Sequence, residues 1–329
     1  MMQREFTQKD IEEIERVLKE FESIANFENP EKSKIPFEIL GYGEISVVIS
    51  IKGLESFVLK RLPIFRNYEE CLYYKGIFDE YGAILKEKVG LRIPKQFGVI
   101  IRSREPVFYS VQERLSNNWL CQQIFNSIDS LDSQKLTDGI ISEIYKVCNF
   151  NNSHKEKYKI GIDGQLSNWA LENGKEGLNQ KNPHFIYLDT STPLIKENGR
   201  EKIPADNFLM SIPPALKFFV KKLFLKEVLE RYYDCRSVIL DFSSNLMNEK
   251  NTKNVKNSLK LISEKYGIKL QEIISYHKRD YIIWRTFLTL RKIHRLILTN
   301  VLHRKYRFLL PPEISVKKIT KEDIKYFKE

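Results

Sequence analysis

The feature of this sequence that most constrains its fold is a change of hydrophobic pattern near residue 115. Between Phe37 and Glu113 the apolar residues fall in short β-rich runs, separated by turns that contain glycine or proline. One helical stretch, about Tyr68 to Lys88, interrupts them and ends before Gly90, a residue that suits a helix C-terminus. This order predicts an antiparallel sheet with a single packed helix, an α+β unit. The predicted strands are Ile45–Ile51, Ser56–Lys60, Phe97–Ile101 and Val107–Gln112.

The chain after Leu115 is expected to be mostly helical. Helix-like apolar spacing extends from Pro214 to about Glu230 and from Val255 to about Arg307. Two short apolar segments interrupt the helical part and resemble strand ends. The residues between them are rich in Asn, Gly and Lys and predict an exposed loop. These segments are Tyr158–Asp163 and Phe185–Asp189, with the loop at Glu172–Pro183.

Three regions are therefore expected along the 329 residues. Thr7 to Asn26 has the apolar spacing of an amphipathic helix and belongs to an N-terminal helical extension, residues 1–34. A small lobe with the sheet follows over residues 35–113, and a larger helical lobe with a basic end covers residues 114–329. At about 100–200 residues per domain, this length fits two units or one large two-lobed domain.

Composition excludes several other classes of protein. A chain with 42% hydrophobic and 29% charged residues is neither disordered nor a small cross-linked scaffold. No apolar run approaches the roughly 18 residues that span a bilayer, and the N-terminus lacks the apolar segment of a signal peptide. The four cysteines stand far apart without a CxxC pair, so neither a zinc ribbon nor a disulfide framework is predicted, and a cytoplasmic location is expected. They are Cys71, Cys121, Cys148 and Cys235.

The positive charge is concentrated in the last quarter of the chain. Residues 251–329 contain 19 Lys+Arg and 7 Asp+Glu, whereas the whole chain has a net charge of +11. Such a field could attract nucleic acid, anionic lipid or a phosphorylated substrate, or it could be a solvated helix surface. Because no RNA-binding signature is present, nucleic acid is not the expected partner. The five histidines form neither HExxH nor a cluster with cysteine, so no zinc site is expected.

The first motif with chemical potential is a glycine pair at a strand–turn–strand. Gly41-Tyr-Gly-Glu-Ile-Ser-Val-Val48 is followed on the next predicted strand by Val58-Leu-Lys60. Two glycines allow the backbone to lie close over phosphates with its N–H groups exposed, and a nearby lysine could neutralise them. Taken alone, a pair of glycines at a hairpin is more often only a turn.

Two further motifs place acids directly after apolar segments. Asp163 follows one segment and is followed five residues later by Asn168, while Asp189 follows Phe185-Ile-Tyr-Leu. An acid with a nearby amide can accept a hydroxyl proton and hold a hard cation through oxygen atoms. Each carboxylate by itself could instead be a helix cap or a turn residue. The order of all these motifs along the chain is what favours a functional interpretation.

The order of these motifs, from about Phe37 to Thr192, resembles that of the protein-kinase-like superfamily. The resemblance is closest to the aminoglycoside phosphotransferase and RIO-like atypical kinases, and indicates an uncharacterised family among them. It implies a bilobal fold with a small antiparallel β-sheet N-lobe, one main helix and a larger, mostly helical C-lobe. It also implies transfer of the γ-phosphoryl group of ATP, with Mg²⁺, to a hydroxyl of an unidentified small-molecule acceptor. The basic C-terminal region favours an anionic acceptor.

The resemblance also implies roles for individual residues. Lys60 and Asp163 would be catalytic, Lys60 on the α- and β-phosphates and Asp163 as the base, while Asn168 and Asp189 would be metal ligands. The hairpin would cover the phosphates, and residues 112–115 would form the hinge that holds adenine. Residues implied to bind the nucleotide are Gly41, Gly43, Ser46, Val48, Lys60, Glu80, Gln112, Glu113 and Leu115.

Among the acids on the predicted helix, Glu80 is the chosen partner of Lys60. It lies twenty residues after Lys60 and fourteen before Pro94, and phosphotransferase-like small lobes have an equivalent glutamate-to-Ile-Pro interval. The helix offers other acids for this role. They are Glu69, Glu70, Asp79 and Glu87.

Departures from the superfamily pattern keep two alternatives open. Ser46 replaces the third glycine of the hairpin, and Gly161-Ile162 precedes Asp163 where the superfamily has a histidine that braces the loop. Asp189 is followed by Thr-Ser and not by Phe-Gly. A catalytically inactive, pseudokinase-like module that binds a nucleotide or a partner is the main alternative, and a basic interaction protein is the other. Oligomeric state is not indicated by any of these features.

Overall fold

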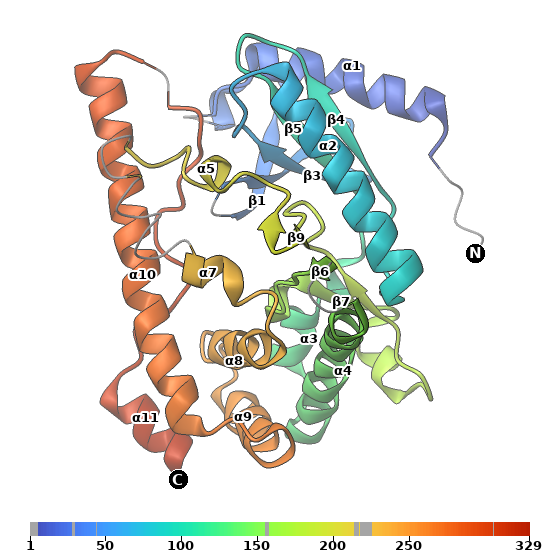
Figure 1. Cartoon of the computed structure of the whole chain (residues 1–329), viewed down its shortest axis with the longest axis vertical. Helices are drawn as coiled ribbons and strands as arrows, with labels where there is room; N and C mark the ends of the chain where they lie inside the picture. The colour runs from blue at the N-terminus through green and yellow to red at the C-terminus, as the bar shows by residue number, and fades with distance from the viewer. Residues whose placement is uncertain are drawn as a thin grey trace.

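The computed structural model (Figure 1) describes residues 6–27, 30–43, 45–154, 158–213, 217, 226–304 and 306–329. Its N-terminal part contains a five-stranded antiparallel sheet with the strand order β1-β2-β3-β5-β4. The four predicted strands are confirmed within two residues at each end, and β1 adds a fifth at the edge. The strands are β1 (Phe37–Tyr42), β2 (Val47–Ile51), β3 (Phe57–Leu62), β4 (Gln96–Ile101) and β5 (Val107–Glu113).

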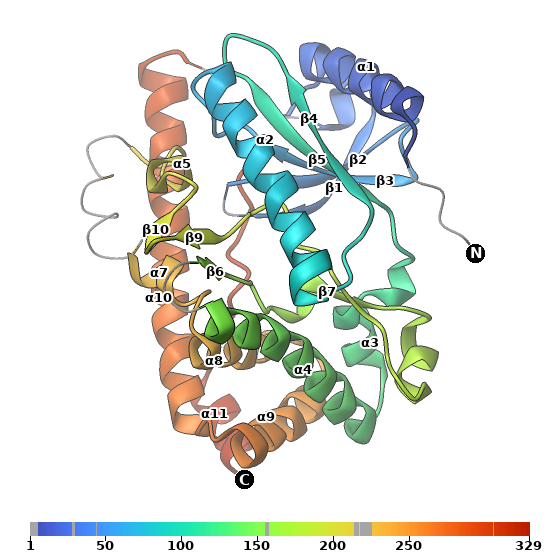
Figure 2. The ribbon, with the colours of Figure 1, turned by 45° about the vertical axis from the view of Figure 1, so that its right-hand side comes forward.

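Two helices cover the two faces of this sheet (Figure 2). α1 (Gln8–Ile24) begins at Thr7, whose side chain accepts a hydrogen bond from the Asp10 N–H, and it buries Ile14, Leu18 and Phe21 against one face. α2 (Tyr68–Ala83) packs on the other face and continues as a π-helical turn that ends at Gly90 in the left-handed conformation. The predicted N-terminal helix is therefore an integral layer of the sheet unit.

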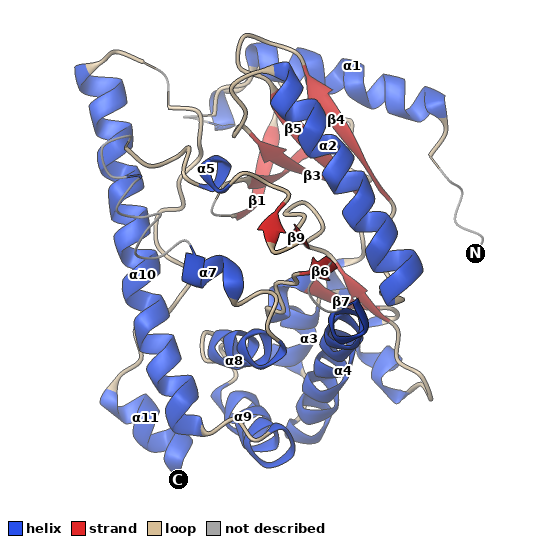
Figure 3. Cartoon of the chain, viewed as in Figure 1, coloured by secondary structure: helices blue, strands red, loops and turns tan. Residues whose placement is uncertain are grey.

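The rest of the chain is mainly helical, as expected, and Figure 3 shows most of its helices at the opposite end from the sheet. The helix expected over 255–307 is two helices, because Gly267 adopts a φ of 67° and caps the first of them. Most of the helix expected over 214–230 lies outside the described residues. The helices are α3 (Cys121–Ser127), α4 (Ser130–His154), α5 (Ala205–Phe208), α7 (Lys226–Glu230), α8 (Cys235–Leu246), α9 (Thr252–Tyr266), α10 (Leu270–Leu296) and α11 (Lys321–Lys328).

Two short strands, β6 and β8, occur where the sequence predicted strand ends, and three others, β7, β9 and β10, were not predicted. β6 pairs with β9, which pairs with β10, and β7 pairs with β8. The loop between β7 and β8 was expected to be exposed, but its centre is packed: Leu178 is 6% exposed, and a Cβ atom at Gly177 would lie 2.1 Å from the Glu172 carbonyl oxygen. The strands are β6 (Tyr158–Ile160), β7 (Trp169–Leu171), β8 (Phe185–Tyr187), β9 (Ile195–Glu197) and β10 (Arg200–Glu201).

No helix among the described residues is long and apolar enough to cross a membrane.

A buried ion pair joins α1, the sheet and the C-terminal region. Arg61 on β3 is 5% exposed, and its Nε donates to Glu22 Oε1 at 2.5 Å. Tyr109 on β5 donates its hydroxyl to the same oxygen. Arg61 Nη1 also donates to the Arg307 carbonyl at 3.1 Å, and Arg307 in turn donates to the Phe65 carbonyl at 3.0 Å. Residues near both ends of the chain therefore meet on the sheet.

Removing one member of this pair should destabilise the fold strongly. Glu22→Gln leaves the Arg61 guanidinium buried without its carboxylate, and we expect the free energy of unfolding to fall by about 2–4 kcal/mol. Denaturant unfolding followed by far-UV circular dichroism measures this loss. Glu20→Gln, an exposed residue on the same helix, is the matched control and should change stability by less than about 0.5 kcal/mol. Equal effects of the two substitutions would contradict the buried-pair interpretation.

A second buried charge cluster holds the segment before α8. The Arg231 guanidinium donates to Asp280 Oδ1 at 2.9 Å and to the Tyr276 hydroxyl at 2.8 Å, and it lies 3.3 Å from Asp241 Oδ1. Two buried carboxylates thus share one cation. Burial raises the pKa of Asp280 to about 6, and Asp241 adds to the rise while Arg231 opposes it.

This raised pKa predicts a specific dependence of stability on pH. The folded state binds the Asp280 proton more tightly than the unfolded state, so this stabilisation is complete below about pH 4 and is lost as the pH rises to about 6. The Asp280→Asn variant has no carboxyl group at this position, so it lacks this titration between pH 4 and pH 6. Relative to wild type, the variant should therefore gain about 2–3 kcal/mol in unfolding free energy between pH 4 and pH 7. Denaturant titrations at several pH values measure the difference, and Asp79→Asn, at an exposed site, should show no such gain. A pH-independent difference would refute the assignment.

Candidate functional site

An ion pair between the sheet and the helical part lies at the centre of the candidate site. Lys60 projects from β3, and its Nζ lies 2.6 Å from Oδ1 of Asp189, which follows β8. The two side chains are 20% and 14% exposed and are separated by 129 positions in the sequence. The structure thus brings together two predicted site residues from the two ends of the motif series.

The segment around Asp189 is held by hydrogen bonds from the sheet and from α2. Gln112 on β5 donates its side-chain amide to the Leu188 carbonyl at 3.0 Å and to the Thr190 hydroxyl at 2.8 Å. Tyr74 on α2 donates its hydroxyl to the Ser191 carbonyl at 2.5 Å. The side chain of Gln112, predicted to belong to an adenine hinge, therefore positions the segment that carries Asp189.

Asp163 and Asn168 form one compact turn beside this segment. The Asn168 side-chain amide donates to the Asp163 carbonyl at 3.2 Å, and the Gln165 N–H donates to the Asp163 carboxylate at 3.2 Å. The Leu188 N–H donates to the Asn168 carbonyl at 2.8 Å, which connects the turn to the residue before Asp189. Because the amide nitrogen of Asn168 is engaged, its side-chain oxygen is the atom suited to a cation.

Two buried tyrosines form hydrogen bonds with the backbone of the Asp163 loop. Tyr81 on α2 donates its hydroxyl to the Gly161 carbonyl at 2.7 Å, and the Asp163 N–H donates to the hydroxyl oxygen of Tyr187 at 3.2 Å. Burial raises the pKa of both tyrosines well above its ordinary value, with a further contribution from nearby carboxylates, so both stay neutral. Since Tyr187 lies two residues before Asp189, it ties the loop to the Asp189 segment.

The glycine hairpin leads directly to Lys60. In the β1–β2 connection the Gly43 N–H donates to the Ser46 carbonyl at 3.0 Å, and a Cβ atom at Gly43 would lie 2.5 Å from the Ser46 hydroxyl. A side chain at position 43 would therefore require the Ser46 hydroxyl to move. Gly41 pairs with Val48, and Val48 pairs with Lys60, so the hairpin and the lysine occupy adjacent strands.

The predicted pairing of Glu80 with Lys60 is wrong in this structure. Glu80 accepts hydrogen bonds from Lys202 at 2.7 Å and from the Tyr158 hydroxyl at 2.5 Å. Burial opposes ionisation of Glu80, but these two donors outweigh it and lower its pKa. The physical reason is the rotation of α2, which turns Tyr74 and Tyr81 inward and leaves Glu80 on a half-exposed side facing β6.

The predicted hinge residues lie at the end of β5 and are partly engaged in the sheet. The Glu113 N–H donates to the Lys95 carbonyl at 3.0 Å, and the Glu113 carboxylate accepts from the Lys95 N–H at 3.0 Å. The next N–H, that of Arg114, donates to the Ser56 carbonyl at 2.8 Å. Leu115 follows and is partly buried. A ligand could therefore not use the Glu113 N–H without displacing a sheet contact.

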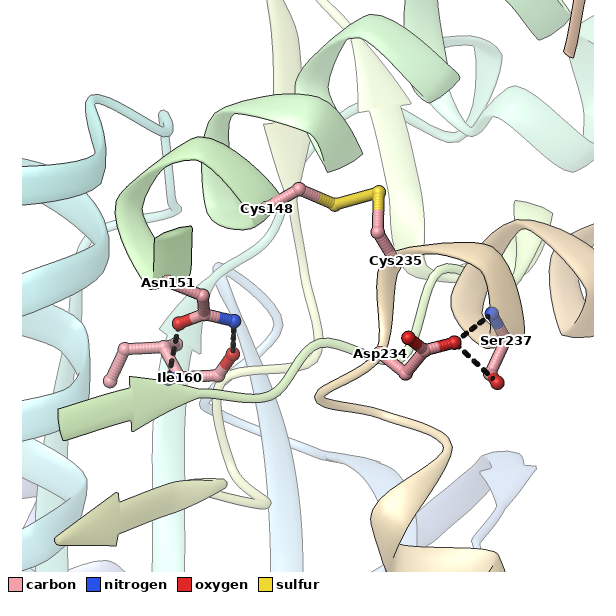
Figure 4. Close-up of a disulfide and its surroundings, with 6 residues drawn as sticks. All are labelled: Cys148, Asn151, Ile160, Asp234, Cys235 and Ser237. Carbon is pink, nitrogen blue, oxygen red and sulfur yellow. Dashed lines mark hydrogen bonds between the residues drawn. A yellow bond between two sulfur atoms is a disulfide. The ribbon is translucent and has the colours of Figure 1, made fainter. Parts of the chain in front are cut away.

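A disulfide, which the sequence did not predict, connects two segments that form hydrogen bonds with the Asp163 loop (Figure 4). Cys148 on α4 is bonded to Cys235 at the start of α8, 87 positions later. One turn after Cys148, Asn151 bonds through its side chain to both the N–H and the carbonyl of Ile160, each at 2.8 Å. Three residues before Cys235, the Tyr232 carbonyl accepts the N–H of Ile162 at 3.0 Å. The loop is thus held from both sides of the disulfide.

A pocket in the described part of the chain adjoins this disulfide. It is lined by the end of α4, the residues before α8, and Lys159 between them, and it contains none of the predicted site residues. Within the described ranges, no three His, Cys, Asp or Glu side chains gather to hold a metal ion. A cation at the candidate site would thus have two protein ligands, Asn168 and Asp189, and would need further oxygen atoms from a substrate.

By its architecture the chain is an α+β protein in which a small antiparallel sheet and a helical C-terminal part meet at the Lys60–Asp189 pair. Residues 25–295 match the model of a Family of unknown function (DUF6206), and the chain belongs to this family. None of the curated proteins matches this sequence.

Opening the disulfide should loosen the loop that carries Asp163. For a closed loop of 87 residues we expect Cys148→Ser/Cys235→Ser to lower the free energy of unfolding by about 2–4 kcal/mol. Amide hydrogen exchange should also accelerate at residues 158–163 but not in β4 or β5, which serve as the internal control. A dithiol reductant should shift the wild-type melting temperature and leave the variant unchanged. A wild type that is insensitive to reductant, with unaltered exchange in the variant, would contradict this role.

Proposed function

We propose that this protein is a kinase-like phosphotransferase that uses ATP and Mg²⁺ and transfers the γ-phosphoryl group to a hydroxyl of a small acceptor. The observation that carries the proposal is the 2.6 Å contact between Lys60 and Asp189. The Asp163–Asn168 turn lies next to it and is joined to the Asp189 segment through Leu188 and Tyr187. A lysine, a base, an amide and an acid that the superfamily uses are thus gathered in one region.

The arrangement of strands around the site also supports this proposal. A five-stranded sheet with one inner helix precedes a helical part, as in a bilobal kinase-like fold. The turn with Asp163 and Asn168 lies between β6 and β7, and Asp189 follows β8. The β6–β9 and β7–β8 pairs therefore flank the two segments that would bind metal and substrate.

Each residue has a defined part in the proposed reaction. The acceptor hydroxyl gives its proton to Asp163, its oxygen forms a bond to the γ-phosphorus, and the bond from that phosphorus to the bridging oxygen breaks, which releases ADP. Lys60 and the N–H groups of the glycine hairpin would offset phosphate charge. Asn168 and Asp189 would hold Mg²⁺, which supplies further charge neutralisation when bound. Positioning and electrostatics thus account for the expected rate enhancement.

One observation favours a non-catalytic nucleotide-binding module instead. Glu80 is bound to Lys202, so the described contacts do not include the lysine–glutamate pair of an active kinase site. The Glu113 N–H is also engaged in the sheet. In such a module the same residues would bind a nucleotide, but Asp163 would have no chemical role.

Ligand-dependent thermal stability distinguishes these functions. ATP with Mg²⁺ should raise the melting temperature of the wild-type protein, and ATP in EDTA should raise it much less. Lys60→Met should weaken ATP binding at least tenfold. Asp163→Asn should preserve binding but reduce ADP formation from ATP at least a hundredfold. The exposed Lys52, replaced by Met, is the matched control and should behave as wild type.

Each alternative has its own outcome in these assays. A shift that is independent of Mg²⁺, without ADP formation in the wild type, would support the nucleotide-binding module. The absence of any shift with ATP, or equal shifts for Lys60→Met and wild type, would refute both proposals.

A further inference from the structure

A segment outside the candidate site combines strong positive charge with exposed apolar side chains. Residues 281–312 contain seven Lys+Arg and neither Asp nor Glu. This stretch covers the C-terminal half of α10, the π-helical turn Ile297–Val301 and the residues that return to the sheet. A run of this length without an acid carries a local positive charge that neighbouring acids in the sequence do not offset.

Four aliphatic side chains of this segment lie on one face of the helix and are exposed to solvent. Ile293 is 43% exposed, Leu296 54%, Ile297 41% and Val301 67%. Their spacing of three and four residues places them on adjacent turns of the same side. We call these four residues the α10 apolar face. Exposed aliphatic residues are unremarkable one by one, but a contiguous group on one helix marks an interaction surface.

The α10 apolar face has a rigid support. Leu288, on the opposite side of the helix, is 7% exposed. His294, at the border of the face, is 8% exposed and is hydrogen-bonded to the Ser211 carbonyl at 3.0 Å. After the helix, Arg307 bonds to the carbonyls of Phe65 and Pro106, each at 3.0 Å. Figure 1 shows α10 along one edge of the molecule. The helix thus presents a fixed and accessible outer side.

Exposed basic side chains lie along one flank of the α10 apolar face and beyond its C-terminal end. Arg285, Lys292, Arg295 and Arg304 all lie within the same tract, and all are exposed. Aliphatic side chains flanked by exposed cations on one helix are the features of helices that lie in the headgroup region of an anionic bilayer. Single-stranded nucleic acid would instead require aromatic side chains for base stacking, and the α10 apolar face has none.

We propose that the α10 apolar face docks the protein onto a membrane surface rich in anionic lipid. The four aliphatic side chains enter the interface shallowly, and the exposed arginines beside them contact the lipid headgroups. This inference does not depend on the proposed function, since none of the candidate site residues lies on α10. It concerns attachment to one side of a bilayer, which agrees with the lack of a spanning helix in the described residues.

Sedimentation with lipid vesicles tests the proposal on the full-length protein. Vesicles of phosphatidylcholine with 30% phosphatidylserine (a composition of roughly physiological anionic content) should bind the wild-type protein at least tenfold more tightly than pure phosphatidylcholine. The difference should shrink at roughly 0.5 M salt. Leu296→Glu/Val301→Glu and Arg285→Glu/Arg295→Glu should each reduce binding at least tenfold. Leu131→Glu, at an apolar residue of α4 that is 63% exposed, is the matched control and should bind as wild type.

Folding of every variant is checked by its melting temperature, and only variants within a few degrees of wild type are compared. Equal binding to both kinds of vesicle, or equal losses in the α4 control and the α10 variants, would overturn the proposal. A wild-type dimer that Leu296→Glu/Val301→Glu converts to a monomer would identify a second copy of this chain as the occupant. Binding to a DNA or RNA oligonucleotide without binding to vesicles would also overturn it.

Discussion

Two consecutive cations on β3 determine how the other parts of the molecule are placed. Because side chains alternate along a strand, Lys60 faces the helical part while Arg61 faces α1. Each cation is largely buried and requires a carboxylate, and the partners, Asp189 and Glu22, come from distant segments. A slip of β3 by one residue would exchange the two faces and leave both carboxylates with the wrong partner. The register of this strand thus links α1, the sheet and the Asp189 segment.

Several hydrogen bonds from different parts of the chain, and not one side chain, hold the Asp163 loop in place. A histidine would organise such a loop from one side, whereas here Tyr81, Asn151, Tyr187 and the Tyr232 carbonyl contact it from four elements of the chain. All of these contacts are hydrogen bonds to backbone groups of residues 160–163. Packing fixes the two residues before Asp163 as well, because a Cβ atom at Gly161 would lie 2.8 Å from the Cβ atom of Leu194, and Ile162 is 1% exposed. The disulfide then fixes the distance between two of the supports.

Local signals in the sequence predicted the four central strands of the sheet and the ends of α1 and α2, because each depends on neighbouring residues. The order of motifs selected Lys60 and Asp189, and the structure places these two side chains in contact. The partner of Glu80 and the disulfide could not be predicted, since they depend on helix rotation and on packing across distant segments. Glu80 was selected among five acids from sequence intervals alone, and such intervals do not determine which way a side chain on the helix points. The hydrogen bonds from α2 to the site did have a signal in the sequence. Tyr74 and Tyr81 are seven residues apart and share a helix face with Ile77, which indicates that both face the core. Their hydroxyl partners only emerge from the tertiary structure.

The packing also limits which parts of the molecule could move to admit a ligand. One continuous core extends from Leu62 on the sheet through α2 and α4 to Leu259 on α9, so the sheet and the helical part cannot separate without exposing it. Arg307 adds hydrogen bonds to the sheet from the C-terminal side. By contrast, β1 is an edge strand whose residues are half-buried or exposed in alternation. Access to Lys60 is therefore expected to depend on movement of the β1–β2 hairpin, the element that carries Gly41 and Gly43, with the rest of the site held in place.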